Sequence, residues 1–230
     1  PVVSVVKGVE NATLMRMSQV VRQVWRSERV AVLSGPTIAQ EVAHGVPTAA
    51  VAASADKMWM LEVQDIFMAP GFRVYANSDV VGIELAGSLK NIIAIACGIS
   101  DGLGFGTNTK AAILSRGLVE MARLGVAMGG RKETFSGIAG LGDLVTTCFN
   151  ELSRNHYVGF EIGKGRSVKK VLGSMKMVAE GVVTARSAWR LGRKYGVELP
   201  IIHEVYQVLF KNKSPRVAVG HLLARAKKTE

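Results

Sequence analysis

Cysteine is scarce in this sequence. The two cysteines, Cys97 and Cys148, lie in apolar surroundings, and their spacing matches no metal-ligand pattern. We therefore predict two reduced thiols in the core and no metal site. Buried thiols of this kind are typical of proteins in a cytosol-like compartment.

Long uncharged apolar runs are absent as well. A membrane-spanning helix needs roughly 18–20 apolar residues with few or no charges. The nearest approach, residues 80–99, contains Glu84 and Lys90, so we expect no membrane span. No signal-peptide pattern is visible either, because Pro1 leads directly into a predicted strand.

The composition is that of a globular protein: 48% of the 230 residues are hydrophobic and 20% are charged, which favours one or two domains. The net charge of +11 comes entirely from residues 81–230, which carry twenty-two Lys/Arg against eleven Asp/Glu; residues 1–80 carry seven of each. Nucleic-acid binding is disfavoured, because the basic residues are scattered along predicted helices without interleaved aromatic residues. A basic domain suits a phosphorylated substrate and a dinucleotide, and a solvated helix surface would explain the charge equally well.

The first eighty residues alternate strand-like and helix-like segments, which predicts a mostly parallel, covered sheet. Beyond them the strand signals stop and helix boundaries follow one another. We place the domain boundary at 79–81, so that an α/β domain over 1–80 precedes an all-α domain over 81–230. The expected strands are 2–6, 30–34, 48–53 and 72–75, and the expected helices of the first domain are 13–25, 37–43 and 56–68.

Lys90 is the most informative residue, because it stands in the middle of an apolar helix predicted over 80–99. The residues one helical turn away are all small or apolar, so its ammonium has no partner on that helix. Burying an unpaired charge costs several kcal/mol. Lys90 must therefore reach a distant carboxylate or a cavity, or have a lowered pKa suited to acid/base work. The alternative is a side chain that extends into solvent.

Two short polar segments follow in the sequence. Asp143 lies in a glycine-rich turn between apolar runs and is a candidate partner for Lys90. Ser153 is predicted to cap a helix over 154–163. Arg154 and Asn155, in the first turn of that helix, suit a small anion, because side-chain donors, backbone N–H groups and the positive end of the helix dipole meet there.

A nucleotide-binding G-x-G-x-x-G fingerprint is missing. The glycines at 102, 104 and 106 do not supply it, because position 107 is threonine and the preceding segment is a predicted helix. We interpret this stretch as a flexible loop between helices.

Six segments share their sequence and order with one family: KGVE (7–10), SGPTIAQE (34–41), GIELAGSLKNIIAIACGISDGLGFGTNTKAA (82–112), AGLGDLVTTC (139–148), LSRNHYVG (152–159) and VAEGVVTA (178–185). With them the chain resembles the NAD(P)-dependent glycerol-3-phosphate dehydrogenases, in their bacterial and plastid-like branch. The match is specific, because the similar 6-phosphogluconate and 3-hydroxyacid dehydrogenases share the lysine-bearing helix but not GLGDL followed by SRN.

The resemblance implies an oxidoreductase of glycerophospholipid metabolism that interconverts sn-glycerol 3-phosphate and dihydroxyacetone phosphate with NAD or NADP. It implies that Lys90 is the general acid in reduction and the general base in oxidation, and that Asp143 orients it. The implied substrate contacts are Lys7, Gly35, Thr37, Lys90, Asp143, Ser153, Arg154 and Asn155, and the implied cofactor contacts are Lys7, Ala39, Arg154, Val178 and Glu180.

The residues themselves leave other interpretations open. Lys7 and the turn 34–37 each follow a predicted strand, so both should face one crevice beside Lys90. Without the resemblance, however, Lys7 is a surface lysine, Thr37 a helix N-cap, and Glu180 an acid favoured by the helix dipole.

Members of this family begin with a strand and a G-x-G-x-x-G turn that hold the cofactor's pyrophosphate, and this sequence contains neither. We therefore expect residues 1–80 to be the C-terminal half of a Rossmann-type domain, followed by an all-α C-terminal domain. The open alternatives are a non-catalytic fragment or interaction domain of the same fold, and a dehydrogenase of another phosphorylated hydroxyacid. The resemblance also implies a homodimer in the cytoplasm, or in a plastid or other organelle, and leaves NAD and NADP open.

Overall fold

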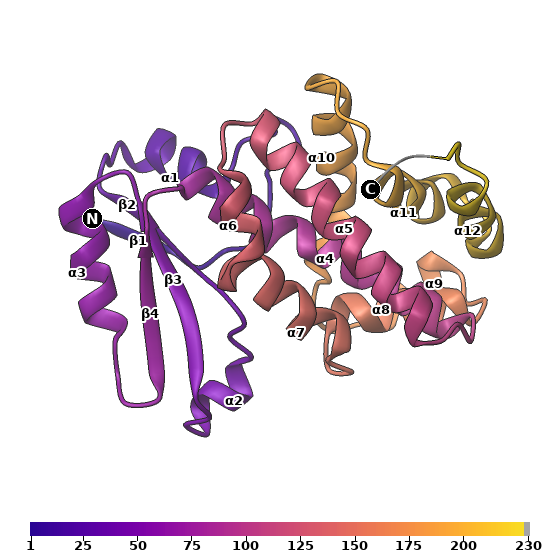
Figure 1. Cartoon of the computed structure of the whole chain (residues 1–230), viewed down its shortest axis with the longest axis horizontal. Coiled ribbons are helices and arrows are strands. Elements are labelled where there is room, and N and C mark those ends of the chain that lie inside the picture. The colour runs from indigo at the N-terminus through magenta and orange to yellow at the C-terminus, as the bar shows by residue number, and fades with distance from the viewer. Residues whose placement is uncertain (228–230) are drawn as a thin grey trace.

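The computed structural model describes residues 1–227, and it begins with a four-stranded sheet flanked by helices (Figure 1). The sheet order is β1-β2-β3-β4, so β1 is an edge strand. The elements of this part are β1 (Val2–Ser4), α1 (Met17–Trp25), β2 (Val30–Ser34), α2 (Ala39–Ala43), β3 (Thr48–Ser54), α3 (Lys57–Phe67) and β4 (Phe72–Asn77).

The sheet is mixed, whereas the alternation of segments predicted a mostly parallel one. Strands β1 and β2 are parallel, as are β3 and β4, but β2 and β3 run antiparallel, with Ser34 opposite Val51. The reason is the short connection between β2 and β3. Its helix α2 has five residues and rises about 7.5 Å, which is too short to return the chain along a seven-residue strand of about 23 Å.

From Val80 onward all described regular elements are helical, so the predicted order of an α/β portion followed by a helical one is confirmed. The helices are α4 (Val80–Gly102), α5 (Thr107–Ala127), α6 (Lys132–Ser136), the π-helical turn η1 (Ile138–Gly142), α7 (Asp143–Phe149), α8 (Arg154–Gly163), α9 (Val168–Gly173), α10 (Glu180–Lys194), α11 (Pro200–Lys211) and α12 (Pro215–Leu223). The loop between α4 and α5 contains the glycines at 104 and 106, as expected.

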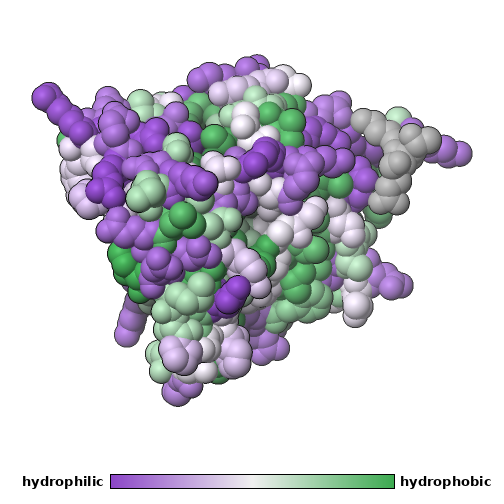
Figure 2. All heavy atoms as spheres, turned by 60° about the vertical axis from the view of Figure 1, so that its left-hand side comes forward, coloured by the Kyte–Doolittle hydropathy of each residue, from purple (hydrophilic) through white to green (hydrophobic). Residues whose placement is uncertain are grey.

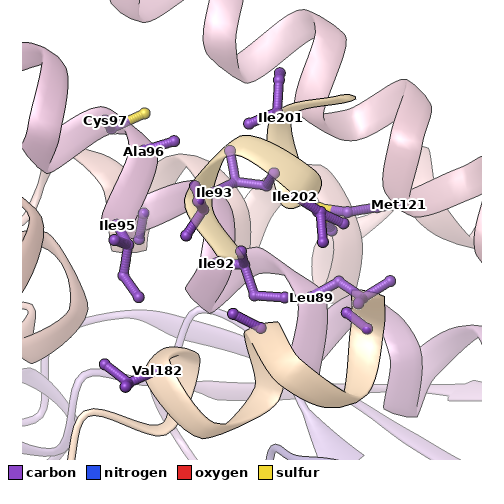
Figure 3. Packing of buried hydrophobic residues seen from close by; sticks show 14 of the residues in the cluster. Leu89, Ile92, Ile93, Ile95, Ala96, Cys97, Met121, Val182, Ile201 and Ile202 are labelled. Atoms are coloured by element: carbon purple, nitrogen blue, oxygen red, sulfur yellow. The ribbon is translucent and has the colours of Figure 1, made fainter. Parts of the chain in front are cut away.

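Helix α4 is the centre of the helical part. Its long side chains pack against residues of α5, α10 and α11, including Met121, Val182 and Ile202 (Figure 3). By length and composition α4 could cross a membrane, yet 94% of its apolar window is buried inside the protein, as in the core helix of a globular domain. The Asp79 carboxylate caps its first turn by accepting from Gly82 N at 2.8 Å.

Four glycines bring α4 and α8 into backbone contact. They lie four residues apart on each helix, Gly98 and Gly102 on α4 and Gly159 and Gly163 on α8. A Cβ added at Gly98 would lie 2.1 Å from His156 O, and one added at Gly159 would lie 2.1 Å from Ile95 O. Because larger residues cannot be accommodated there, this seam fixes the start of α8 relative to α4.

Several apolar residues are exposed in the sheet-bearing part. Val5, Val6, Val24 and Trp25, which follow β1 or end α1, are each more than half exposed. Figure 2 shows the side of the molecule that lies to the left in Figure 1, with apolar patches between hydrophilic ones. Helix α1 is also shorter than the predicted 13–25, because Leu14 adopts a positive φ of 62° in the turn that precedes it.

Candidate active site

Lys90 is buried and paired. Only 5% of the residue is exposed, so its side chain does not extend into solvent. Its ammonium donates to Asp143 Oδ1 at 2.5 Å and to Thr147 Oγ1 at 2.6 Å. The distant carboxylate that the isolated lysine required is therefore Asp143, at the first residue of α7.

Lys7 binds the same carboxylate from the sheet side. Its Nζ donates to Asp143 Oδ2 at 2.6 Å and to the carbonyl oxygen of Gly35 at 3.0 Å. Gly87 on α4 leaves room for the Lys7 stem, because a Cβ there would lie 3.4 Å from Lys7 Cγ and 2.8 Å from Ser34 Oγ. One carboxylate thus holds two ammonium groups, one on each of its oxygens.

This arrangement changes the proton affinity of Lys90. The pKa of Lys90 is lowered from its ordinary value of 10.5 to about 8, chiefly because the residue is buried; the charge of Asp143 opposes this shift, and the charge of Lys7 adds to it. A lysine with a pKa near 8 exchanges a proton readily close to neutral pH. Acid/base work at this position is therefore chemically feasible.

Thr147 was not predicted as part of the site. The glycine-rich segment before Asp143 suggested a turn, whereas the structure forms η1 there and begins α7 at Asp143. The tight coil requires glycine at 140, since a Cβ would lie 2.0 Å from Phe135 O. With a helix starting at Asp143, the i, i+4 spacing places Thr147 on the same face, and that spacing was the available signal.

The turn after β2 joins this cluster through its backbone. Gly35 has a φ of 149°, and a Cβ there would lie 3.0 Å from Ala49 O, so the position requires glycine. Thr37 N donates to Gly35 O at 2.9 Å, and Ile38, not Thr37, is the N-cap of α2. Ala39 is exposed at the start of α2.

The start of α8 is held against α4 and α10. Ser153 caps α8 by accepting from His156 N at 3.3 Å. The buried Asn155 accepts from Gly181 N at 2.9 Å through Oδ1. Gly181 also lies against the residue next to Lys90, because a Cβ added to it would be 2.6 Å from Asn91 O. The structure therefore brings the Ser153–Asn155 turn to the same part of α4 as Lys90.

Two expected cofactor contacts pair with each other. Arg154 Nη2 lies 3.1 Å from Glu180 Oε1, and both side chains are partly exposed, at 38% and 41%. Val178, two residues before Glu180, is 65% exposed. An exposed valine beside an open ion pair forms a surface that a larger ligand could cover.

Of the two lysines, only Lys7 is partly exposed to solvent. The side chain of Lys7 is 22% exposed, and two cavities of 380 and 310 Å³ lie elsewhere, at α10–α12 and where the sheet meets α6 and η1. Neither cavity is lined by Lys7, Lys90 or Asp143. The site is thus a largely buried hydrogen-bonded cluster that reaches solvent at Lys7.

Comparison with known proteins decides the family. Residues 79–220 match the C-terminal region of the NAD-dependent glycerol-3-phosphate dehydrogenases, and residues 1–60 match their N-terminal region. The chain belongs to this family. Among its relatives is an NAD(P)+ glycerol-3-phosphate dehydrogenase of Syntrophotalea carbinolica, 54% identical over 99% of this chain and 69% of the relative. Another, from Geobacter metallireducens, is 56% identical over 97% of this chain and 68% of the relative.

Solved structures of glycerol-3-phosphate dehydrogenases have the same fold. The crystal structure of the Coxiella burnetii protein superposes with a TM-score of 0.92 at 39% identity and covers 97% of this chain and 68% of that one. The Dunaliella salina protein gives a TM-score of 0.87 at 27% identity, over 99% of this chain and 41% of that one. The 230 residues thus correspond to about two thirds of the bacterial glycerol-3-phosphate dehydrogenases.

Proposed function

We propose that this chain carries the acid/base and substrate-binding residues of an enzyme that interconverts sn-glycerol 3-phosphate and dihydroxyacetone phosphate with NAD or NADP. The observation that carries the proposal is the buried Lys90 ammonium on Asp143, within a family of glycerol-3-phosphate dehydrogenases.

The reaction requires a proton at the substrate oxygen. In reduction, Lys90 Nζ donates that proton to the carbonyl oxygen, and in oxidation it removes the proton from the hydroxyl. Asp143 and Thr147 hold the ammonium in place, and burial, aided by the charge of Lys7, keeps its pKa low. A lysine with an ordinary pKa would release its proton less readily near neutral pH.

The phosphate of the substrate binds at the start of α8 in this proposal. The Arg154 guanidinium, the first backbone N–H groups of α8 and its helix dipole all favour an anion there. Lys7 and the turn at Gly35 and Thr37 contact the other end of the three-carbon substrate. An incoming phosphate would compete with Glu180 for Arg154, which is possible because their ion pair is half-exposed.

The open surface near Arg154, Val178 and Glu180 is compatible with a nicotinamide cofactor. The exposed apolar side chain of Val178 would be covered by such a ligand, and the adjacent charges would contact its polar groups. The cofactor supplies or accepts the hydride. The protein's part is to bind the substrate, exclude water and exchange the proton at Lys90.

The proposal is tested in the full-length enzyme, meaning this chain together with the N-terminal region that the family resemblance implies. Lys90→Ala should lower kcat for dihydroxyacetone phosphate reduction by about 10²–10⁴-fold while circular dichroism shows an intact fold. Near-normal kcat in this variant would reject Lys90 as the acid/base group. Thermal protection by another phosphorylated hydroxyacid, but not by glycerol 3-phosphate, would indicate a different substrate.

The proposal further includes a cytoplasmic homodimer that supplies glycerol phosphate for phospholipid synthesis. Its support is the family resemblance and, for the compartment, the two free buried cysteines. Light scattering on the full-length enzyme measures the oligomeric state.

A further inference from the structure

Residues 7–16 are a loop that forms most of the connection between β1 and α1, and they hydrogen-bond to one another. The Glu10 carboxylate accepts from Ala12 N at 2.8 Å and from Thr13 N at 2.5 Å. Glu10 N donates to Met15 O at 2.9 Å, so the loop closes on itself. An isolated antiparallel bridge between Val9 and Arg16 also joins the beginning of the loop to its end.

This loop follows a strand of the sheet, yet it is attached to the helical domain. Val9 is 5% exposed and belongs to the core cluster that surrounds α4. Ser187 Oγ on α10 donates to Asn11 Oδ1 at 2.6 Å, and Arg190 on α10 donates to the carbonyl oxygen of Asn11.

The far end of the loop is attached to α4 by a buried carboxylate. Glu84 is 4% exposed, and its Oε1 accepts from Ser18 N at 2.7 Å while its Oε2 accepts from Ser18 Oγ at 2.6 Å. Arg16 also pairs with Oε2. Ser18 is the second residue of α1, so the carboxylate binds the positive end of that helix as well.

Both ends of the loop therefore rest on α4. The stem of Lys7 passes Gly87, and Arg16 and Ser18 bind Glu84, one helical turn earlier on α4. Lys90 lies one turn further along the same helix. We propose that Glu84 is a positioning residue for the substrate site, which fixes this loop on α4 and thereby holds the Lys7 ammonium on Asp143.

This inference rests on the proposed function, because it gives Glu84 a role in binding the substrate through Lys7. The competing explanation is that Glu84 only stabilises the fold. If Glu84 acts through Lys7, its substitution changes KM no further once Lys7 has been removed. If Glu84 only stabilises the fold, its substitution changes KM equally with and without Lys7. A double-mutant cycle therefore separates the two explanations.

The cycle compares Glu84→Gln, Lys7→Met and their combination in the full-length enzyme. Gln loses one acceptor oxygen and the charge that binds Arg16, so Glu84→Gln should raise the KM for dihydroxyacetone phosphate about tenfold and change kcat less. In the Lys7→Met background, Glu84→Gln should change KM by less than about twofold. An equal rise of KM in both backgrounds would overturn the proposal.

Glu120 provides a matched control. It is also 4% exposed, and its carboxylate binds the N-terminus of α11 by accepting from Ile201 N and Ile202 N at 2.8 and 3.2 Å. Glu120→Gln should lower the melting temperature without raising KM. If it raises KM as much as Glu84→Gln does, the effect of Glu84 is general destabilisation.

Hydrogen exchange tests, independently of activity, whether Glu84 holds the loop on α4. In Glu84→Gln, peptides covering residues 7–18 should lose protection, whereas Glu120→Gln should leave them unchanged. If Glu84→Gln does not fold, Ser18→Ala removes a bond to the same carboxylate and replaces it in both experiments. A wild type without dihydroxyacetone phosphate reduction would reject the proposed function, while unchanged exchange in 7–18 would reject the role of Glu84.

Discussion

The Asp143 carboxylate binds two ammonium groups, and this sharing explains why Lys90 can be both buried and reactive. A single buried pair would hold the lysine proton tightly, because each charge stabilises the other. With Lys7 on the second oxygen, burial prevails, and the pKa of Lys90 falls to about 8.

The lowered pKa predicts opposite pH profiles for the two directions of the reaction. Reduction needs the protonated lysine, so its kcat/KM should fall as the pH rises through about 8, whereas oxidation should become faster over the same range. Lys7→Met removes a neighbouring positive charge and should move both transitions to higher pH. Steady-state rates between pH 6 and about 10 measure this; transitions that do not move would show that Lys7 does not tune Lys90.

Stability should depend on the same titration. Between the folded pKa of about 8 and the ordinary 10.5, the folded protein binds fewer protons than the unfolded chain, so stability should rise with pH across this window. Across the whole window, the titration of Lys90 should raise the free energy of unfolding by on the order of 3 kcal/mol. Lys90→Met should lack this pH dependence. Near pH 7 this variant should be as stable as the wild type or more stable, because Asp143 keeps Lys7 as a partner.

Urea unfolding of wild type and Lys90→Met at several pH values provides the comparison. A constant difference in the free energy of unfolding between pH 7 and about 10 would mean that Lys90 has an ordinary pKa.

Arg154 gives a prediction about the substrate anion. Arg154→Ala should raise the substrate KM at least about tenfold, since a charge-assisted hydrogen bond contributes roughly 1.5–3 kcal/mol. Arg154→Lys should restore only part of this, because an ammonium lacks the planar fork of the guanidinium. Unchanged KM in both variants, measured by steady-state kinetics, would place the anion away from the start of α8.

At the scale of elements, the glycine seam between α4 and α8 determines where the substrate-binding turn lies. Gly98→Ala should destabilise the fold by roughly 1–3 kcal/mol, because its Cβ would meet the backbone oxygen of His156 at 2.1 Å and a backbone cannot move aside as a side chain can. It should also raise the substrate KM, since His156 lies one residue after Asn155 in the first turn of α8.

Gly220 in α12 is the control for this substitution. It has no atom within 4 Å of an added Cβ, so Gly220→Ala should stabilise the protein by up to about 1 kcal/mol through helix propensity. Chemical denaturation of both variants measures the difference. If Gly98→Ala is as stable as Gly220→Ala, the close contact between α4 and α8 is not required.

The sequence predicts an element well where neighbouring residues signal it, and less well elsewhere. The capped helix over 154–163 was predicted to the residue, because Ser153 and the apolar spacing are local signals. The antiparallel pairing of β2 with β3 was missed because the alternation of strands and helices favours parallel pairing, although α2 is too short for a crossover, and the π-helical turn was missed because its glycines suggested an irregular turn. The Lys90–Asp143 pair spans 53 residues, so no local pattern predicts it, and what pointed to it was the chemical need of a buried charge together with the family resemblance.

At the scale of the whole molecule, the sheet that carries Lys7 has an exposed edge. Strand β1 is an edge strand, and Val5, Val6, Val24 and Trp25 nearby are more than half exposed. About one third of the length of these relatives lies outside the region that matches this chain. A sheet edge of this kind is where a further strand can pair.

We therefore expect the 230-residue chain alone to retain some affinity for the substrate phosphate but little for the cofactor. The residues of the proposed anion site lie mostly on the helical domain, whose positive charge attracts phosphate regardless of the sheet, whereas the G-x-G-x-x-G turn that binds a pyrophosphate is not in this sequence. The isolated chain should bind glycerol 3-phosphate or inorganic phosphate weakly, bind NAD(H) and NADP(H) poorly, and show no dehydrogenase activity. Calorimetric titration with each ligand, with Arg154→Ala as the control for the anion, measures these affinities. Tight cofactor binding together with catalysis would show that these residues suffice for a complete dinucleotide site.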